Sequence, residues 1–330
     1  EAGKNFKAKC PFHNEKTPSF FISPDKGSYY CFGCNAKGDI FSFVEQFEGT
    51  DFLGSLKLLA SRAGVVLERG QSRETLDAKE RLYDIIEDAT QFFEAQLVDN
   101  KEAHSYLRNR GLSAETITSF RIGYAPDSWR SVSDHLIKKG YTKDDLEKVG
   151  LVKISDSGFY DRFRSRVMFP ISDSSGRVIA FSGRLFGKDD AVEAKYLNSP
   201  DTPLFNKSNV LFGIDKAKGA IRSRGYSIIV EGQMDLLLSH QAGFTNTVAV
   251  SGTAFTDTVV DAESKINNLG LVRRLSPNVI FAFDGDSAGV RACSRACMIA
   301  LSLDMQVKVV HIPEGKDPAD IATDAKTLQQ

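Results

Sequence analysis

The sequence lacks any long apolar run. No stretch of its 330 residues approaches the roughly 18 consecutive apolar residues that a membrane helix requires. The first residues also have neither the apolar core nor the cleavage site of a secretory signal. We therefore expect a soluble, cytoplasmic protein without a membrane partner. A hydrophobic fraction of 42% is enough for two or three domains with cores of their own.

An excess of charge of either sign is also lacking. The net charge of -1 gives no whole-chain electrostatic case for binding nucleic acid, so such a surface would have to come from local clusters of basic residues. Cysteine is scarce, and three of the five cysteines lie within the first 34 residues beside a histidine. An odd number clustered in this way argues against a disulfide scaffold and indicates metal ligands.

The cysteine cluster has the spacing of a structural metal site. One pair is Cys10 and His13, the other is Cys31 and Cys34, and 17 residues separate the pairs. Two such pairs supply the S and N ligands of a closed tetrahedral site, for which zinc is the expected ion. The segment between them alternates as a hairpin does, which predicts a zinc ribbon. Unligated thiols and a redox switch remain open as alternatives.

Aromatic residues lie close to the cysteines and to several lysines. Rings for stacked bases and cations for phosphates are typical of proteins that bind single strands. The same rings would also serve as the small core of a ribbon, and the sequence leaves both interpretations open. These rings are Phe20, Tyr29, Tyr30 and Phe32.

Changes in composition divide the chain into three units and a linker. We predict a zinc-binding domain over residues 1–68, a polar linker over 69–82, an α+β subdomain over 83–222 and a parallel-sheet subdomain over 223–330. In the last unit, short β-branched runs such as "SIIVEG" and "NVIFAFDGD" alternate with segments of helix length. This alternation predicts a parallel sheet built of βα units.

Acidic residues follow three of the predicted parallel strands. Ligands of open parallel sheets bind outside the carboxyl ends of the strands, so these side chains should meet at one edge. Clustered carboxylates repel one another and bind hard cations such as Mg²⁺ or Mn²⁺, two of which can support a phosphoryl transfer. A "DGD" alone would be an ordinary turn. The acids are Glu231, Asp235, Asp284, Asp286, Asp317 and Asp320.

Eight motifs along the chain occur together and in order in one known family. The sequence resembles bacterial DnaG-type DNA primases over their zinc-binding and RNA polymerase domains. The motifs are "CPFHNEKTPSF", "CFGCNAKGDIFSFV", "YDRFRSRVMFPI", "GRVIAFSGR", "KYLNSP", "VEGQMD", "FAFDGDSAG" and "GKDPAD". The resemblance implies an α+β multidomain fold with an N-terminal zinc ribbon, a basic α+β subdomain and a TOPRIM α/β parallel-sheet subdomain.

The same resemblance implies a DNA-directed RNA polymerase that makes short RNA primers for replication. Its template would be single-stranded DNA, its substrates ribonucleoside triphosphates, and its cofactors structural Zn²⁺ and catalytic Mg²⁺ or Mn²⁺. Further partners would be a replicative helicase, through a C-terminal domain absent from this chain, and a single-stranded DNA-binding protein. The chain also lacks the family's usual start and a "GxxxxGK[ST]" loop, so we expect an excised catalytic fragment and not a fused primase and helicase.

The resemblance assigns roles to the acids. Glu231 would be a metal ligand or a general acid/base, Asp284 and Asp286 paired metal ligands, and Asp317 the acid of the third motif, while Asp235 and Asp320 rank second. Two residues depart from the family pattern. Gln233 replaces a tyrosine that would stack on a nucleotide, and Ala319 stands where an acid often follows the proline.

Basic residues gather in the middle of the chain. Arg162, Arg164 and Arg166 alternate with other residues, so on a strand their guanidinium groups would share one face. The resemblance implies a basic ridge that guides the template and binds the incoming nucleotide. The alternative for each single arginine is a solvated charge or a local ion pair. Further members of this predicted ridge are Arg184, Lys195, Tyr196, Asn198 and Lys207.

Three rival interpretations remain at this point. A TOPRIM nuclease or topoisomerase would share the acid pattern but cut strands. A non-catalytic module would bind single strands with strong salt dependence and without any need for Mg²⁺. Finally, the zinc could do no more than stabilise the small domain, which is compatible with a primase.

Overall fold

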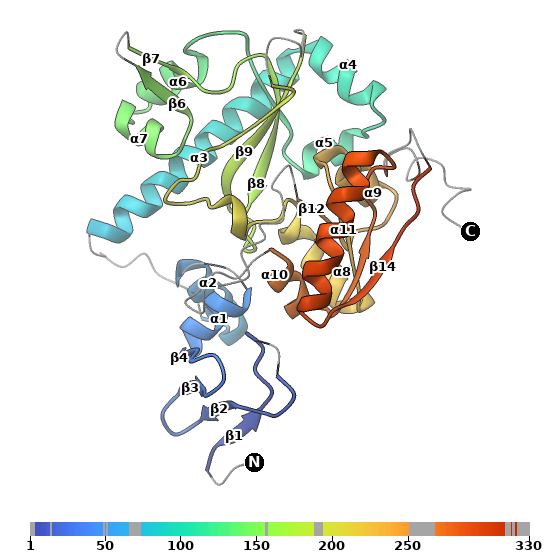
Figure 1. Ribbon diagram of the computed structural model, residues 1–330. Coiled ribbons are helices and arrows are strands. Elements are labelled where there is room, and N and C mark those ends of the chain that lie inside the picture. The colour runs from blue at the N-terminus through green and yellow to red at the C-terminus, as the bar shows by residue number, and fades with distance from the viewer. Residues whose placement is uncertain are drawn as a thin grey trace.

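The computed structural model describes most of the chain. The described residues are 4–13, 15–48, 50, 52–65, 74–155, 158–187, 194–250, 268–313, 318 and 321. They form a small N-terminal domain below a larger body that contains an antiparallel and a parallel sheet (Figure 1). In this part of the chain, none of the helices combines the length and the apolar character needed to cross a membrane.

The N-terminal domain is a four-stranded antiparallel sheet followed by two helices. Its core is small and aromatic: the rings of Phe20 and Tyr29 are buried and stack at 5.2 Å, beside Cys10 and Cys31. These two rings therefore belong to the core, whereas Phe32 is 69% exposed. The elements are β1 (Phe6–Ala8), β2 (Phe20–Ser23), β3 (Ser28–Cys31), β4 (Lys37–Asp39), α1 (Ile40–Glu48) and α2 (Phe52–Ala63).

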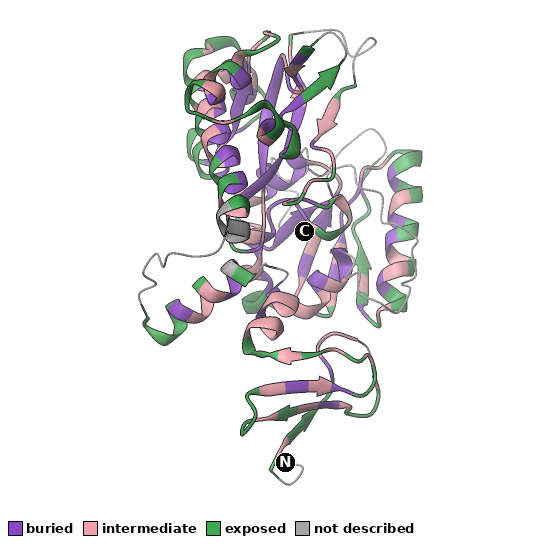
Figure 2. Ribbon diagram, turned by 90° about the vertical axis from the view of Figure 1, so that its left-hand side faces the viewer, coloured by how far each residue is buried: buried purple, intermediate pink, exposed green. Residues whose placement is uncertain are grey.

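The long helix α3 (Glu74–Asp99) begins the larger body. Residues 74–82 of the predicted linker are thus helical. The helix packs against an antiparallel sheet. Phe93 of the helix contacts Phe181 of the sheet, with ring centroids 5.4 Å apart. The order of this sheet is β10-β9-β8-β5, and the two central strands are almost wholly buried (Figure 2). Its strands are β5 (Gly123–Ala125), β8 (Arg166–Ser172), β9 (Val178–Leu185) and β10 (Tyr196–Asn198).

Short elements complete the antiparallel half. The buried carboxylate of Asp161 accepts hydrogen bonds from the N–H groups of Val132 at 2.9 Å and Ser133 at 3.2 Å. These two N–H groups lie in the first turn of the helix Ser131–Lys138, where they have no partner within the helix. The elements are α4 (Lys101–Asn109), α5 (Ala114–Ser119), α6 (Ser131–Lys138), α7 (Lys143–Lys148), β6 (Val152–Ser155), β7 (Gly158–Asp161) and the 3₁₀ turn η1 (Lys207–Asn209).

The last part of the chain forms the predicted parallel sheet. Strand order is β12-β11-β13-β14, all neighbouring pairs are parallel, and helices connect the strands. With the ribbon and the antiparallel sheet, this confirms the predicted α+β multidomain class. The elements are α8 (Ile214–Arg224), β11 (Ser227–Val230), α9 (Gln233–Gln241), β12 (Thr247–Ala249), α10 (Asn268–Leu275), β13 (Asn278–Phe281), α11 (Ser287–Ser302) and β14 (Gln306–Val309).

The antiparallel and parallel halves share one hydrophobic core. This cluster joins Val167 and Phe169 of β8 to Val230 of β11 and to Met234 and Leu236 of α9. Among the described residues, those of the zinc ribbon form a separate small cluster, and none of them belongs to this core. Burial of apolar surface therefore holds the two halves together.

The ribbon domain rests on the parallel-sheet half through its first helix. Helix α1 contacts α10, and the buried carboxylate of Glu48 at the end of α1 lies 2.8 Å from Nη2 of Arg222 in α8. The Arg222 guanidinium also lies 5.9 Å from the ring centroid of Phe47. An ion pair with one buried partner thus fixes this end of the interface.

Candidate zinc centre and acidic edge

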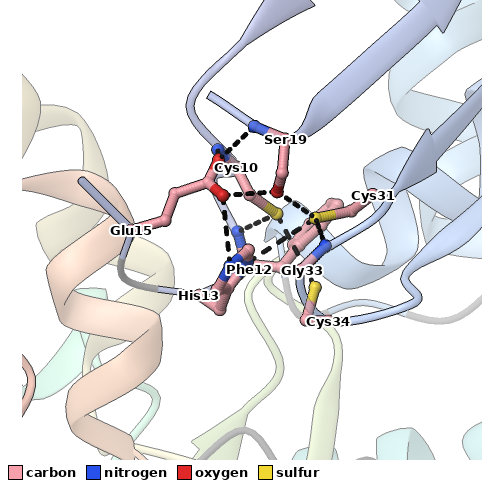
Figure 3. Close-up of polar contacts among 8 residues, drawn as sticks. All are labelled: Cys10, Phe12, His13, Glu15, Ser19, Cys31, Gly33 and Cys34. Atoms are coloured by element: carbon pink, nitrogen blue, oxygen red, sulfur yellow. Dashed lines mark hydrogen bonds and ion pairs between the residues drawn. The ribbon is translucent and has the colours of Figure 1, made fainter. Parts of the chain in front are cut away.

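The four predicted zinc ligands converge on one point. Their ligand atoms all lie within 4.8 Å of one another, with Sγ of Cys10 3.8 Å from Sγ of Cys34 and Sγ of Cys31 3.7 Å from Nδ1 of His13 (Figure 3). A tetrahedral zinc ion with Zn–S bonds of about 2.3 Å would separate its sulfurs by about 3.8 Å. The donor set and its spacing therefore fit a bound zinc ion.

The carboxylate of Glu15 contacts the residues that carry two of the zinc ligands, Cys10 and His13. Oε1 of Glu15 accepts hydrogen bonds from the N–H groups of Cys10 at 2.7 Å and Ser19 at 2.9 Å. Oε2 lies 3.4 Å from Nε2 of His13, whereas the other ring nitrogen, Nδ1, lies near Sγ of Cys31. Such a carboxylate fixes the orientation of a ligating histidine. Sequence analysis missed Glu15, whose only signal was its place two residues after the histidine.

Backbone groups complete the surroundings of the thiolates. The N–H of Phe12 lies 3.4 Å from Sγ of Cys10, and the N–H of Gly33 lies 3.4 Å from Sγ of Cys31. A Cβ at Gly33 would collide with the His13 ring, so the close approach of the two knuckles requires glycine here. These contacts belong to a closed structural site, in keeping with the zinc interpretation and not with an exposed redox thiolate.

The acids of the parallel sheet lie where two neighbouring strands end. Glu231 follows β11 and Asp284 follows β13, and the N–H of Asp284 donates to Oε1 of Glu231 at 3.2 Å. Burial raises the pKa of Glu231, and the charges of Asp284 and Asp286 raise it further. The three carboxylates therefore repel one another, and their oxygens are the ligands that Mg²⁺ or Mn²⁺ prefers.

Two of the acids also cap helices. Oδ1 of Asp286 accepts from the N–H groups of Ala288 at 2.9 Å and Gly289 at 2.7 Å at the start of α11. Oδ2 of Asp235 accepts from the N–H of Gly232 at 3.1 Å at the start of α9. Each cap holds its carboxyl group in a defined direction beside the edge of the sheet.

Glycines allow the chain to crowd around the acids. A Cβ at Gly289 would lie 2.8 Å from Oε1 of Glu231 and would collide with the carbonyl oxygen of Asp284. A Cβ at Gly285 would lie 2.7 Å from the carbonyl oxygen of Ile312, in the segment that follows β14. Strand β14 therefore also delivers its following loop to this edge.

The remaining predicted acids cannot be placed. Asp317, Asp320 and the departure Ala319 lie outside the described residues. Among the residues that are described, the zinc cluster is the only group of three or more potential ligands that converge within 4.8 Å. The assignment of metal-binding roles to the acids thus stays a prediction.

The departure at Gln233 has a structural explanation. Its side chain is buried, and Nε2 donates to Oγ of Ser182 in β9 at 2.8 Å. The amide therefore joins the first turn of α9 to the antiparallel sheet. A buried group engaged in this way presents no ring or edge for a nucleotide to stack on.

The expectation that three arginines share a strand face is wrong. Only Arg166 lies in a strand, because Ser165 has a positive φ of 50° that breaks the extended chain before it. Arg166 is buried and donates to the carbonyl oxygens of Gly183 at 3.1 Å and Ala194 at 2.9 Å. Its guanidinium thus braces the antiparallel sheet.

The other two arginines point to different places. Nη2 of Arg162 donates to the carbonyl oxygen of Asn198 at 3.1 Å, which anchors β10. Arg164 lies over the ring of Trp129, with Cζ 4.3 Å from the centroid, and 5.2 Å from that of Tyr160. Trp129 is 65% exposed. An exposed indole backed by a cation was missed in the sequence because the partners are distant along the chain.

Arg184 and Tyr196 form a second polar cluster, in the antiparallel sheet. They are register partners in β9 and β10, and Nη1 of Arg184 donates to Oη of Tyr196 at 2.6 Å. Burial raises the pKa of Tyr196, Arg184 opposes this, and the negative charge of Asp235 adds to the rise. Tyr196 of the antiparallel sheet and Asp235 in the first turn of α9 therefore lie within electrostatic reach of each other. Lys195 is exposed beside this pair and Lys207 is half-buried.

Comparisons with known proteins agree with this architecture. Three family models match the chain: the CHC2 zinc finger over residues 1–75, the N-terminal domain of the DNA primase catalytic core over 92–218, and a Toprim-like domain over 228–322. The first identifies the cysteine cluster as a structural zinc site, and the third is a domain that binds divalent metal ions.

Individual relatives extend the similarity across the whole chain. A DNA primase from Halalkalibacterium halodurans is 40% identical over 96% of this chain and 52% of its own length. The crystal structure of the zinc-binding and RNA polymerase domains of Aquifex aeolicus primase matches with a TM-score of 0.69 and 34% identity, over 100% of this chain and 78% of that one. A DnaG primase catalytic domain bound to ssDNA matches with a TM-score of 0.65 and 33% identity, over 77% of this chain and 78% of that one. The chain spans about half the length of the curated relatives it matches.

Removal of one zinc ligand should empty the centre. We expect Cys34→Ser to reduce bound zinc from one ion per chain to nearly none and to unfold the small domain, because a structural zinc site supplies folding free energy directly. Zinc content is measured with a chromophoric chelator and folding by circular dichroism. Cys297→Ser, in α11, is the control and should keep its zinc; a zinc-loaded Cys34→Ser protein would contradict the assignment.

Substitution of Gly289 should damage the acidic edge. Because a Cβ there displaces Glu231 and the Asp284 backbone, we expect Gly289→Ala to weaken Mn²⁺ binding by about tenfold or more, as a misplaced ligand does. Electron paramagnetic resonance titration of free Mn²⁺ measures this. Gly219→Ala is the control, since a Cβ at Gly219 meets nothing within 4 Å. Equal Mn²⁺ affinity in both variants would show that these acids do not hold the ion.

Proposed function

The chain belongs to the family of bacterial DnaG-type DNA primases, and we propose that it synthesises short RNA primers on a single-stranded DNA template. One observation carries the proposal beyond family membership. The carboxylates that follow β11 and β13 gather at one edge of the parallel sheet, and the Arg184–Tyr196 pair lies within electrostatic reach of that edge. Acids for metal ions and a cation for phosphates are the two components that nucleotidyl transfer needs.

In the proposed reaction, the 3′-hydroxyl of a primer attacks the α-phosphate of a ribonucleoside triphosphate and pyrophosphate leaves. Divalent ions held by Glu231, Asp284, Asp286 and Asp317 would supply charge stabilisation to the attacking and leaving oxygens. The pKa of Glu231 is raised, which suits this carboxylate to accept a proton. A bound cation would instead stabilise its charged form and lower the pKa again. Asp235 and Asp320 have secondary roles in this proposal, and the cap made by Asp235 suits it to positioning.

Template and nucleotide would be held by the antiparallel half. Arg184 and Tyr196 are paired in β9 and β10, and Tyr196 lies within electrostatic reach of Asp235. A triphosphate held there would meet the cations Arg184 and Lys195. Trp129 with Arg164 offers an exposed ring for a template base. Arg162, Arg166 and Asn198, which join the strands through backbone contacts, would act by positioning, and Lys207 would add charge. The relative bound to ssDNA supports a single-stranded template.

Association with the replication machinery is part of the same proposal. Family membership supports a replicative helicase and a single-stranded DNA-binding protein as partners, and the cytoplasm as the compartment. Pull-down with each purified partner, using this chain and a full-length relative in parallel, tests whether the residues present here are enough for binding.

Loss of one acid should stop primer synthesis and leave template binding intact. We expect Asp284→Asn to reduce incorporation of labelled ribonucleotides by about 100-fold or more, the scale of one lost electrostatic contact to a transition state. Template affinity, measured by fluorescence anisotropy at fixed salt, should stay within about twofold, because phosphate contacts dominate it. Asp304→Asn, an exposed position where the left-handed backbone tolerates asparagine, is the matched control.

These measurements also separate the rival classes. Strand cutting in place of ribonucleotide incorporation would favour a TOPRIM nuclease or topoisomerase. Full template binding with no synthesis by the unaltered chain, at any Mg²⁺ or Mn²⁺ concentration, would favour a non-catalytic binding module. Undiminished synthesis by Asp284→Asn would remove the acid from the proposed machinery.

The exposed indole should contribute to template affinity. We expect Trp129→Ala to weaken single-stranded DNA binding by about 5- to 150-fold, which corresponds to the loss of stacking on one base at about 1–3 kcal/mol. Anisotropy titrations at several salt concentrations should show an unchanged salt slope, because no cation is removed. Val98→Ala, which truncates an apolar side chain on α3 that is 80% exposed, is the control. A loss shared by both variants would contradict a stacking role for Trp129.

A further inference from the structure

A second aromatic ring contacts Arg184. Tyr106 lies in α4, and the Cζ atom of Arg184 is 5.9 Å from the centroid of its ring. The same guanidinium lies 5.3 Å from the ring centroid of Tyr196, whose Oη accepts a hydrogen bond from Nη1 at 2.6 Å. Both rings are close enough to the cation for a cation–π interaction. Two tyrosines, one from a helix and one from a strand, therefore hold one guanidinium.

The ring of Tyr106 is itself fixed in place. It packs against the ring of Phe186 with centroids 5.2 Å apart, and the ring of Phe186 lies 6.0 Å from that of Tyr124. Tyr106 and Phe186 pack against the core that the two halves share, and the buried side chain of Leu107 anchors α4 in the same core. Close packing of this kind restricts side-chain motion, so Tyr106 presents a fixed surface to Arg184.

The charge of Arg184 is not neutralised by any described carboxylate. Among the residues that the structure describes, no acid forms an ion pair with it, whereas Arg121 and Arg177 each pair with two acids. Its orientation comes from an uncharged hydroxyl group and two rings. A guanidinium held in this way keeps its net charge and N–H donors for a phosphate group. Arg184 is therefore oriented and still available to an anion.

We propose that Tyr106 is a positioning residue whose ring holds the Arg184 guanidinium in the direction in which it contacts a phosphate group of the bound ribonucleoside triphosphate. This role rests on the proposed function, in which Arg184 binds the triphosphate. A guanidinium that is fixed before binding loses less conformational entropy when the phosphate arrives, so the ring increases the affinity for triphosphates. Without the ring, Arg184 would keep its hydrogen bond to Tyr196 and gain side-chain freedom.

Binding of ATP and of inorganic triphosphate to the whole chain tests this role. We expect Tyr106→Leu to weaken both by about three- to thirtyfold, the scale of one cation–π contact, and Tyr106→Phe, which keeps the ring, to retain most of the affinity. Isothermal titration calorimetry measures triphosphate binding, and fluorescence anisotropy should show unchanged template affinity.

Tyr141→Leu is the matched control for this measurement. Tyr141 is a half-buried tyrosine outside the proposed site, and Cζ of Arg81 lies 5.2 Å from its ring centroid. Its loss should leave triphosphate affinity unchanged. Equal triphosphate affinity in Tyr106→Leu and the unaltered chain would contradict the positioning role. A loss of template affinity in place of triphosphate affinity would assign Arg184 to the strand and would also overturn the proposal.

The electrostatic part of the contact can be tested at nearly constant shape. Phenylalanines with increasing numbers of ring fluorines, introduced in place of Tyr106 by genetic code expansion, keep the size of the ring and weaken its attraction for a cation. We expect triphosphate affinity to fall stepwise along the series, while the thermal unfolding temperature stays close to that of Tyr106→Phe. A ring that only fills space would give the same affinity throughout, which is incompatible with the proposal.

A double-mutant cycle shows whether Tyr106 acts through Arg184. Arg184→Gln should weaken triphosphate binding by about tenfold or more, as the loss of a charge-assisted hydrogen bond does. In that background Tyr106→Leu should cause no further loss, because the group that it positions is already gone. Additive losses would show that Tyr106 acts independently of Arg184 and would overturn the proposal.

Kinetics separate this inference from the proposed function. In primer synthesis, Tyr106→Leu should raise the KM for ribonucleotides and leave kcat nearly unchanged, as expected when binding of substrate and transition state weakens equally. If the unaltered chain binds triphosphate and makes primers but Tyr106→Leu matches it in both, only the positioning role fails. If the unaltered chain neither binds triphosphate nor incorporates ribonucleotides, the proposed function fails and the role of Tyr106 fails with it.

Discussion

The parallel pairing of β11 with β13 is the constraint on which the acidic edge depends. Ile229 lies opposite Phe281, so the residues that follow the two strands must emerge together, and Glu231 accepts a hydrogen bond from the backbone of Asp284. The mutual repulsion of these acids raises the pKa of Glu231 and is tolerated because the core below the edge is apolar and well packed. Sheet packing thus offsets an electrostatic cost that a divalent cation would relieve.

Features set by local spacing could be predicted from the sequence. The two ligand pairs of the zinc centre and the βα alternation of the last third depend on near neighbours, and the structure bears both out. Features that depend on distant partners could not be predicted. The three alternating arginines suggested a strand, but Ser165 adopts a left-handed backbone conformation that the sequence pattern does not predict. The stacking of Arg164 on Trp129 and the support of His13 by Glu15 likewise arise only from the folded chain.

The zinc centre and the acidic edge differ in how their side chains are held. The zinc centre is enclosed by backbone N–H groups and a supporting carboxylate, in a domain whose small aromatic core needs a further staple. The acidic edge is half-exposed, with two of its carboxylates also used as helix caps. The enclosed zinc centre suits an ion that stays for the lifetime of the fold. The more exposed acidic edge would suit cations that enter and leave with phosphates.

The shared core and the buried amide of Gln233 have a consequence for motion. Gln233 donates to Ser182 at 2.8 Å, and Met234 and Leu236 pack with residues of β8. The acidic edge and the antiparallel sheet that carries Arg184 therefore belong to one rigid unit. A hinge motion between the halves would separate these apolar side chains and break the Gln233–Ser182 hydrogen bond, so it would cost free energy. The two halves should therefore act as one rigid unit toward a bound strand.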